Sequence, residues 1–362
     1  MSEKRLLVLE DGQVFEGIGF GGNNFKVGEI VFNTSMMGYQ EVLSDVAYCS
    51  QIVMMTYPMI GNYGINRDGF ENMDPAVFGL VVGEYCEKPC NWRSEMTLNE
   101  FMVLKNIPGI ADIDTRKLTR IIRNEGVMKA VMAEASADVE KIVAMLKTYE
   151  MPIDQVAQFS TKKSFQIPNR GDKIVLIDLG SKNEVVRELN MRQLDITVVP
   201  YNTSAKDIMA LHPDGIVLSD GPGNPENVTE TIETIRELMG KVPMFGVCLG
   251  QELIALACGA TTSKLKFGHR GGNHPVINLA TGKAEITSQN HSYEVDEDSL
   301  KGTGLVVTHR ALNDKSVEGL KHETYPLFSV QYHPETSSDV EDENNLFNQF
   351  YTMIETFKKE GK

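Results

Sequence analysis

Short apolar runs alternate with segments of helical period between residues 172 and 257. The apolar runs have the length of β-strands and are Lys173 to Asp178, Ile196 to Pro200, Gly215 to Leu218 and Val242 to Val247. The helical segments between them cover about 183–192, 205–210 and 227–238. Strands that are apolar throughout are typical of parallel sheets covered by helices on both faces. The sequence therefore predicts a doubly wound, mostly parallel α/β domain over residues 172–362.

The first 152 residues follow a different, β-rich pattern. An alternating strand over residues 5–10 leads to a hairpin signal at Asp11-Gly12, and residues 13–20 can return as its partner. Further strands are expected over 29–33 and 77–82, and helices over 112–123 and 138–149. Because the chain has 362 residues, two domains are expected. We predict a β-rich N-terminal domain over 1–152, a polar linker over 153–171 and the α/β domain over 172–362.

The charge of the chain disfavours two classes of partner. It has 35 Lys and Arg against 50 Asp and Glu, a formal net charge of −15. Such a chain has no broad attraction for nucleic acid phosphates or anionic lipids. No segment approaches the roughly 20 apolar residues that span a bilayer, and the start lacks a signal-peptide core. We expect no nucleic acid partner and no membrane partner.

The cysteines indicate a reducing compartment. There are five of them, and an odd number in a long chain argues against a disulfide framework. The cytoplasm is therefore the expected location. Cys86 and Cys90 lack a second pair of ligands at a spacing that suits zinc, so no metal site is predicted.

A nucleophile elbow is predicted at Cys248. A strand runs into Gly246-Val-Cys248-Leu-Gly250, and a helix begins at once. The two glycines permit a tight turn and a close approach of the backbone. A helix N-terminus favours the thiolate, which is the attacking species. A free cysteine is more often a small buried apolar residue, but the flanking glycines favour the nucleophile.

A base for this thiol is predicted in Gln331-Tyr-His333-Pro-Glu335. His333 is the histidine with a carboxylate fixed beside it, because Pro334 restricts the backbone on both sides. Glu335 could orient the imidazole ring and stabilise its cationic form. Another loop, Gly221-Pro-Gly223, follows a predicted strand and could offer backbone N–H groups to an oxyanion, although a simple turn would read the same way.

These motifs together resemble the class I glutamine amidotransferases, whose Cys-His-Glu triad hydrolyses the side-chain amide of glutamine. Within that class, further segments are similar to the small, glutamine-hydrolysing subunits of carbamoyl phosphate synthetases. The segments are 266–275 (KFGHRGGNHP), 288–296 (SQNHSYEVD), 28–41 (GEIVFNTSMMGYQE), 56–62 (TYPMIGN) and 111–120 (ADIDTRKLTR). The resemblance covers nearly the whole chain.

The resemblance implies a role for each matching residue. Cys248 would be the nucleophile, His333 the general base and acid, and Glu335 the orienting carboxylate. Residues expected to bind glutamine or its oxyanion are Gly221, Gly223, Leu249, Glu252, Asn290, Ser292 and Tyr293. Two positions depart from the family. Gln251-Glu252 replaces a frequent His-Gln, so an amide becomes a carboxylate that cannot donate. Ala47 replaces a frequent serine, so no glutamine contact is expected there.

The resemblance also implies a partner. The chain would release ammonia from L-glutamine and pass it to a large subunit, which makes carbamoyl phosphate from bicarbonate and two ATP for arginine and pyrimidine synthesis. No cofactor is expected in this chain; ATP and Mg would belong to the large subunit. Two alternatives are a non-catalytic docking or regulatory subunit and a free-standing thiol amidohydrolase.

Three smaller features have ordinary interpretations. A basic cluster in the first domain fits a solvated helix face, or else a surface that docks an acidic partner. Its members are Arg116, Lys117, Arg120, Arg123 and Lys129. The resemblance implies structural roles for His269 and His274, and Cys258 is expected to pack inside the helix after the elbow.

Overall fold

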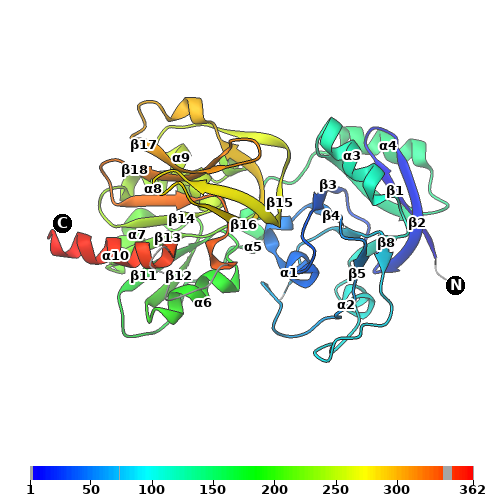
Figure 1. Cartoon of the computed structure of the whole chain (residues 1–362), viewed down its shortest axis with the longest axis horizontal. Helices are drawn as coiled ribbons and strands as arrows, with labels where there is room; N and C mark the ends of the chain where they lie inside the picture. Colours follow the sequence, from blue (N-terminus) through cyan, green and yellow to red (C-terminus); the bar gives the residue numbers. More distant parts are fainter. Residues whose placement is uncertain (1–2, 73, 337–344, 362) are drawn as a thin grey trace. The chain divides into compact units, whose positions relative to one another are not determined.

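The computed structural model describes residues 3–72, 74–336 and 345–361. The chain forms two compact units, residues 1–152 and 153–362, and each is described by itself (Figure 1). Within the described residues, no helix is both long enough and apolar enough to cross a membrane.

Unit 1 is a closed β-barrel with the strand order β1-β2-β8-β6-β4-β3-β9. Its strands are β1 (Lys4–Leu9), β2 (Val14–Gly21), β3 (Gly28–Asn33), β4 (Gln51–Met55), β6 (Gly79–Val81), β8 (Pro108–Ala111) and β9 (Met128–Glu134). Parallel pairing runs from β3 through β4 and β6 to β8, and the other neighbours are antiparallel. A small parallel pair, β5 (Met59–Ile60) with β7 (Glu84–Tyr85), lies apart from the barrel sheet.

The ends of the helices in unit 1 follow from local chemistry. The helices are α1 (Tyr39–Ser44), α2 (Leu98–Leu104), α3 (Thr115–Glu125) and α4 (Val139–Thr148), with the 3-10 turn η1 (Val46–Tyr48) after α1. The Asp114 side chain accepts from the N–H of Lys117 at the start of α3. Gly126, with φ 98°, ends the same helix. The hairpin expected at Asp11-Gly12 joins β1 and β2, and Gly12 has φ 92°.

Unit 2 contains a ten-stranded sheet with the order β10-β12-β11-β13-β14-β19-β18-β17-β15-β16. The strands from β12 to β19 in this order are parallel: β12 (Asp195–Pro200), β11 (Lys173–Asp178), β13 (Gly215–Leu218), β14 (Met244–Val247) and β19 (Leu327–Val330). The remaining strands pair antiparallel: β10 (Phe165–Ile167), β15 (Thr262–Asn278), β16 (Ala284–Val295), β17 (Leu305–Ala311) and β18 (Val317–His322).

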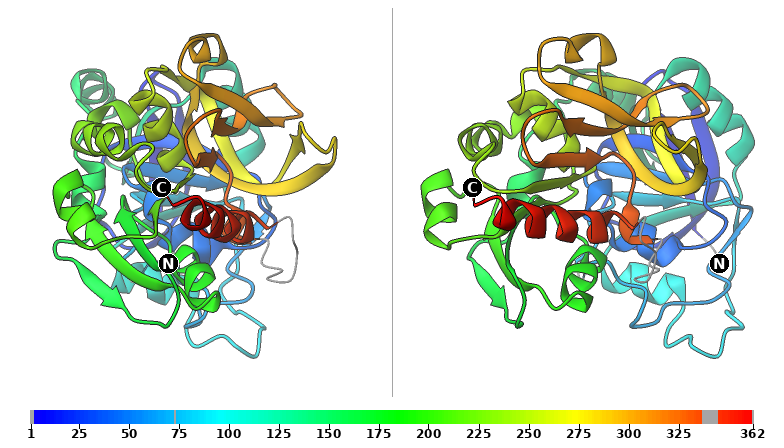
Figure 2. Two further views of the ribbon diagram at one scale, coloured as in Figure 1. Left: turned by 90° about the vertical axis from the view of Figure 1, so that its left-hand side faces the viewer. Right: turned by 60° about the vertical axis from the view of Figure 1, so that its left-hand side comes forward.

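Helices cover both faces of the parallel strands, as the doubly wound prediction requires (Figure 2). Along β11, Val175 and Ile177 belong to one core, and Ile174 and Leu176 belong to the other. The first core is completed by α7 (Ala205–Ala210), α8 (Thr229–Leu238) and α9 (Leu249–Ala257). The second core is completed by α6 (Asn183–Met191) and α10 (Leu346–Lys359). Alternate side chains of one strand thus enter two cores, which explains why the run is apolar throughout.

The structure differs from the expectations in two places. Residues 153–171, expected to be a linker, belong to unit 2 and carry α5 (Gln155–Phe159) and β10, which pairs with β12. The segment was read as a linker because only three residues of β10 pair, too few to show a periodic pattern. The sequence from Pro275 to Gln331 also predicts shorter strands and hairpins, but β16 forms a long antiparallel pair with β15, with two register shifts that are consistent with the glycines in β15.

Candidate active site

Four loops of unit 2 converge on one edge of the sheet. They follow β11, β13, β14 and β19, which are neighbours in that order and are parallel. The carboxyl ends of parallel strands meet at the same edge, where open α/β sheets bind their ligands. Lys182, Gly221, Cys248 and His333 stand in these loops, so residues 151 positions apart in the chain share one site.

Cys248 occupies a strained turn between β14 and α9. Its φ of 53° and ψ of −108° are unusual for a residue with a side chain. Its N–H donates to the carbonyl of Val330 on β19 over 2.8 Å, which fixes the turn to the neighbouring strand. A Cβ on Gly246 would lie 2.6 Å from Ile254 Cδ1, and one on Gly250 would lie 2.6 Å from the carbonyl oxygen of Leu218. Both positions therefore require glycine, because a side chain at either one would collide with neighbouring atoms.

The thiol of Cys248 is buried among polar groups. Its Sγ lies 3.7 Å from the backbone oxygen of Asn290 and 3.8 Å from Nε2 of Gln331. The residue is 2% exposed, so protein atoms rather than bulk water surround the thiol. The helix α9 begins at the next residue, and its N-terminus favours a thiolate.

His333 and Glu335 form a fully buried pair. His333 Nδ1 lies 2.8 Å from Glu335 Oε1, and the N–H of His333 donates to the carbonyl of Ser288 on β16. Because a carboxylate only accepts, Nδ1 carries the hydrogen and Nε2 has the lone pair that a base needs. Within the described residues, Nε2 has no hydrogen-bond partner. Pro334 begins the 3-10 turn η4 (Pro334–Thr336), which turns Glu335 back toward the imidazole ring.

Charge keeps Glu335 ionised. Burial opposes its ionisation, but the charge and hydrogen bond of His333, together with the Lys182 ammonium, hold the pKa of Glu335 below its usual value. Lys182 Nζ lies 3.8 Å from Glu335 Oε1 and 4.0 Å from Asp220 Oδ2. A buried cation thus sits between two buried carboxylates.

Lys182 and Gln331 are site residues that the sequence interpretation missed. Lys182 is 8% exposed, and its Nζ lies 3.3 Å from His333 Nδ1. A lysine just after a predicted buried strand, at the carboxyl end of the sheet, was the available signal. Gln331 lies within the quoted histidine motif, but a neutral amide beside a catalytic motif suggests no role by itself. Its Nε2 bridges the thiol of Cys248 and Oε1 of Glu252, the latter over 2.9 Å.

Of the two glycines expected to frame an oxyanion, Gly221 lies beside the elbow and Gly223 lies against Gln155. A Cβ on Gly221 would lie 2.9 Å from Leu249 Cδ2, so these two loops touch. Gly223 has φ 97°, and a Cβ there would lie 2.9 Å from Gln155 Oε1, a residue of the segment first read as a linker. Only glycine fits this conformation and this space. That Gly223 and Leu249 donate to an oxyanion stays a prediction.

Burial changes the chemistry expected of Glu252. This side chain is fully buried, and burial raises its pKa to about 8 although Gln331 donates to it. At neutral pH the group is therefore a carboxylic acid, which can donate one hydrogen bond as an amide can. The sequence interpretation had treated it as an acceptor alone. Gln251, the other unusual residue, is fully buried in a network with Gln331 and Ser329.

The expected glutamine contacts on β16 have different surroundings. Asn290 is buried, and its backbone oxygen faces the thiol. Ser292 accepts a hydrogen bond from Arg270 on β15, and the ring of Tyr293 lies near the Lys264 ammonium. Both are held by β15. Ala47 lies in unit 1, in η1, with its N–H donating to Asp45.

We expect the substitution Glu252→Gln to stabilise the chain, and more at pH 8 than at pH 5. In the unfolded chain the carboxyl ionises near its ordinary pKa of 4.5, whereas in the fold its pKa is about 8. The unfolded state releases a proton that the fold keeps, so the wild-type free energy of unfolding falls between these two values. The advantage of the variant should grow by up to about 1.4 kcal/mol per pH unit.

Urea unfolding of both proteins at the two pH values measures this difference. The side-chain oxygen of the introduced amide can still accept from Gln331, so the hydrogen bond is matched in the variant. An advantage of equal size at pH 5 and pH 8 would show that Glu252 ionises normally in the fold.

The other features singled out in the sequence are distributed as follows. Arg116, Lys117, Arg120 and Arg123 are exposed on or beside α3, but Lys129 is mostly buried and pairs with Glu10 over 3.0 Å. Lys129 therefore does not belong to the exposed basic cluster. The thiols of Cys86 and Cys90 lie near backbone oxygens of Lys88 and Asn62. Cys258 caps the end of α9, half-buried against Met239.

The fold of unit 2, the elbow at Cys248 and the His333–Glu335 pair together define a class I glutamine amidotransferase domain. The family model described as glutamine amidotransferase class-I matches residues 175–353. The model described as carbamoyl-phosphate synthase small chain, CPSase domain, matches residues 7–132. The chain belongs to the family of carbamoyl phosphate synthase small chains, because relatives of that name are more than half identical to it over almost its whole length.

Three relatives illustrate the match. The carbamoyl phosphate synthase pyrimidine-specific small chain of Bacillus subtilis is 56% identical over 359 residues, 99% of this chain and 98% of the relative. The carbamoyl phosphate synthase small chain of Bacillus cereus is 58% identical with the same coverage. The pyrimidine-specific small chain of Halalkalibacterium halodurans is 55% identical over 355 residues, 98% of each chain.

Proposed function

We propose that this chain is the glutaminase subunit of a carbamoyl phosphate synthase. It hydrolyses L-glutamine to glutamate and ammonia, and the ammonia passes to a large subunit that makes carbamoyl phosphate. The observation that carries the proposal is the strained Cys248 turn, joined by a hydrogen bond to β19, the strand that leads to the buried His333–Glu335 pair. A cysteine held at positive φ between a strand and a helix is an arrangement for attack by the thiolate.

In the first half-reaction the Cys248 sulfur attacks the side-chain amide carbon of glutamine. The carbon–sulfur bond forms and the carbonyl oxygen gains negative charge, which backbone N–H groups near Gly223 and Leu249 would stabilise. His333 Nε2 receives the thiol proton and gives it to the departing nitrogen. Ammonia leaves, and a γ-glutamyl thioester remains on Cys248. Glu335 stabilises the imidazolium between these proton transfers.

In the second half-reaction water releases glutamate. His333 Nε2 removes a proton from the water, and the oxygen attacks the thioester carbon. The tetrahedral intermediate collapses with cleavage of the carbon–sulfur bond, and the proton returns to sulfur. The protonated Glu252 carboxyl and the Asn290 segment of β16 are suited to hold the substrate, because they contact the same Gln331–Cys248 cluster.

The proposed partner is a large subunit that binds ATP and Mg and consumes the ammonia. Unit 1 supports this partner, because its residues 7–132 match the model described as carbamoyl-phosphate synthase small chain, CPSase domain, and a small chain implies a large one. The exposed cations of α3, Arg116, Lys117, Arg120 and Arg123, are a candidate surface for an acidic partner.

A test is to mix the purified chain with the large chain from the same organism and measure carbamoyl phosphate formation. We expect the two to co-purify, and the pair to use glutamine with bicarbonate and ATP, because the small chain supplies the ammonia. Glutaminase activity is measured in parallel on the small chain alone.

The other two functions give different results in the same experiment. A docking or regulatory subunit would bind the large chain and leave synthesis dependent on added ammonia. A free-standing thiol amidohydrolase would turn over glutamine at full rate by itself and bind no large chain. Either result would replace the proposal.

A further inference from the structure

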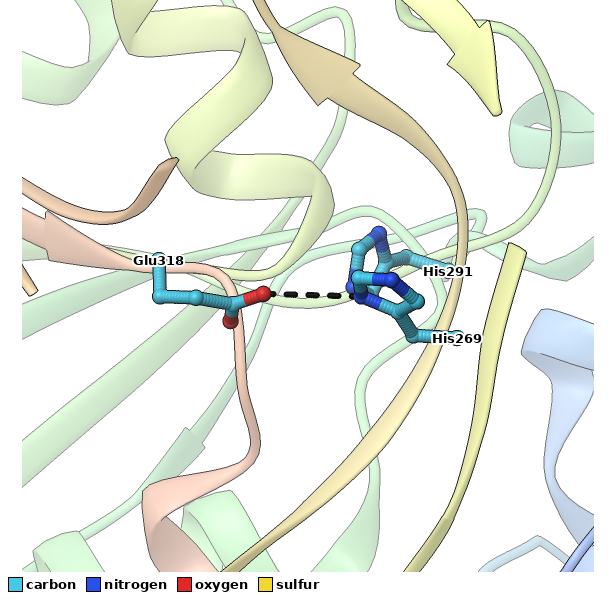
Figure 3. Close-up of side chains that lie close together, drawn as sticks. All are labelled: His269, His291 and Glu318. Atoms are coloured by element: carbon cyan, nitrogen blue, oxygen red, sulfur yellow. Dashed lines mark ion pairs between the residues drawn. The ribbon is translucent and has the colours of Figure 1, made fainter. Parts of the chain in front are cut away.

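A second cluster of reactive side chains lies on the antiparallel part of the sheet in unit 2. It consists of His269 on β15, His291 on β16 and Glu318 on β18. All three residues are buried. Each has one atom that could bind a metal ion, and these three atoms lie within 4.8 Å of one another. Figure 3 shows the two imidazole rings next to each other with the Glu318 carboxylate pointing toward them. The proposed glutamine hydrolysis uses none of these groups.

Each histidine is oriented through the nitrogen that faces away from the cluster. His269 Nε2 lies 2.7 Å from Asp314 Oδ2, and His291 Nδ1 lies 2.7 Å from the backbone oxygen of Tyr293. Histidines that bind metals are held in this way, by a carboxylate or a carbonyl on the second nitrogen. The remaining nitrogens, Nδ1 of His269 and Nε2 of His291, are then the ones available as ligands.

Both of these nitrogens lack a satisfactory hydrogen bond. His269 Nδ1 is buried with no hydrogen-bond partner within the described residues, and Glu318 Oε1 is 3.5 Å away. His291 Nδ1 donates to the backbone oxygen of Tyr293, so Nε2 of the neutral ring is an acceptor. That acceptor lies 3.1 Å from Gln289 Oε1, which is also an acceptor.

Turning the Gln289 amide does not remove the conflict. Its Nε2 now donates to Glu318 Oε2 over 2.9 Å. If the amide were reversed, its nitrogen would serve His291, but its oxygen would face the Glu318 carboxylate instead. In either orientation two acceptors meet, unless the reversed amide accepts from a protonated Glu318 or a positive charge lies between the imidazole and the carboxylate. The cluster therefore has a place for one positive charge, which a metal ion or a proton can supply.

We propose that His269 Nδ1, His291 Nε2 and Glu318 form a binding site for one divalent transition metal ion of the zinc type. Two imidazole nitrogens and one carboxylate oxygen are ligands that zinc accepts, with water at a fourth position. With bonds of about 2.0–2.1 Å, tetrahedral ligand atoms are about 3.3 Å apart, close to the 3.5 Å between His269 and Glu318.

The ion would be structural for the glutamine site. It would tie together β15, β16 and β18, and His291 stands directly after Asn290, whose backbone oxygen faces the thiol of Cys248. The alternative is a protonated His269 that bridges two carboxylates. Burial lowers the pKa of His269, but Asp314 and Glu318 together raise it to about 9, so a proton competes with the metal at Nδ1.

The test measures metal binding and not activity. The full chain, carrying Cys86→Ser, Cys90→Ser and Cys248→Ser to remove competing thiolates, is stripped with a chelator and titrated with Zn²⁺, and with Co²⁺ as a spectroscopic probe. We expect one equivalent of metal and the visible absorption of Co²⁺ bound by nitrogen and oxygen.

Matched variants locate the site. His291→Gln and Glu318→Gln should each abolish binding of the one equivalent of metal. His212→Gln, which changes an exposed histidine, should still bind it. Asp314→Asn changes an exposed side chain, so it should fold even if the buried variants do not, and it should weaken metal binding about 10- to 100-fold. A chain that binds no stoichiometric metal, or that keeps it with unchanged affinity in both His291→Gln and Glu318→Gln, would overturn the proposal.

Discussion

Replacing Cys248 with serine is expected to abolish glutamine-dependent carbamoyl phosphate synthesis and to leave ammonia-dependent synthesis by the assembled pair unchanged. A hydroxyl at the elbow would occupy the same position but ionises far less readily than a thiol, so no nucleophile forms at neutral pH. Loss of a nucleophile in a Ser-His-Asp enzyme lowers kcat by about 10⁶, and we expect a fall of about 10⁴ to 10⁶ in glutaminase activity.

Cys258→Ser is the matched control for this substitution. Cys258 stands at the other end of α9, half-buried against Met239, and away from the elbow. It should keep most of the activity. Glutaminase and both synthesis assays are run on the same reconstituted pair, and thermal unfolding checks the fold. If Cys248→Ser, correctly folded, lost ammonia-dependent synthesis as well, the elbow would have a role in the large chain's reaction and the proposed one would fail.

The parallel half of the fold could be predicted because its strands are apolar throughout. The predicted and observed bounds agree at β11 and β13, where each strand enters two cores and no polar residue interrupts the run. The elbow was predictable for a related reason, since both of its glycines stand where a Cβ would collide with backbone or core atoms. Steric requirements of this kind are local and leave a direct trace in the sequence.

The barrel of unit 1 was predictable only in part. β1, β2, β3 and β6 were expected, but β4, β8 and β9 were not, although β4 is completely buried. Runs such as Gln51–Met55 and Pro108–Ala111 are too short to separate from a buried loop or helix by period alone. Their pairing, parallel for β4 with its two neighbours, depends on residues far away in the chain.

The residues of the site also fall into two groups, those that a local motif reveals and those that only the folded structure reveals. Cys248, His333 and the loop at Gly221 carry motifs, so they could be named in advance. Lys182 could not, because its importance is a distance of 3.3 Å to a histidine in the loop after β19. The ionisation of Glu252 also follows from its burial, which the sequence does not specify.

Replacing Glu335 with glutamine is expected to lower glutaminase kcat by about 10² to 10⁴. The amide can accept from His333 Nδ1, so the ring keeps its orientation, but the negative charge is lost. Lys182 Nζ, 3.3 Å from the same nitrogen, would then oppose formation of the imidazolium that both half-reactions require. The pH profile of kcat gives the signature of a charge effect, because the limb that reports the base should move to lower pH.

The same substitution should cost stability in a way that depends on pH. The pKa of Glu335 lies below its ordinary 4.5, so its ionisation stabilises the fold above that value and the contribution is lost as the pH falls further. We expect Glu335→Gln to lower the free energy of unfolding at pH 7 by roughly 3 kcal/mol, since it leaves a buried cation with one carboxylate fewer, and the gap should narrow below pH 4.5. Glu184→Gln removes a neighbouring, half-buried carboxyl that repels Glu335, so it should not lower stability. Equal losses in both variants, with unchanged pH profiles, would show that Glu335 does not stabilise the charge on His333.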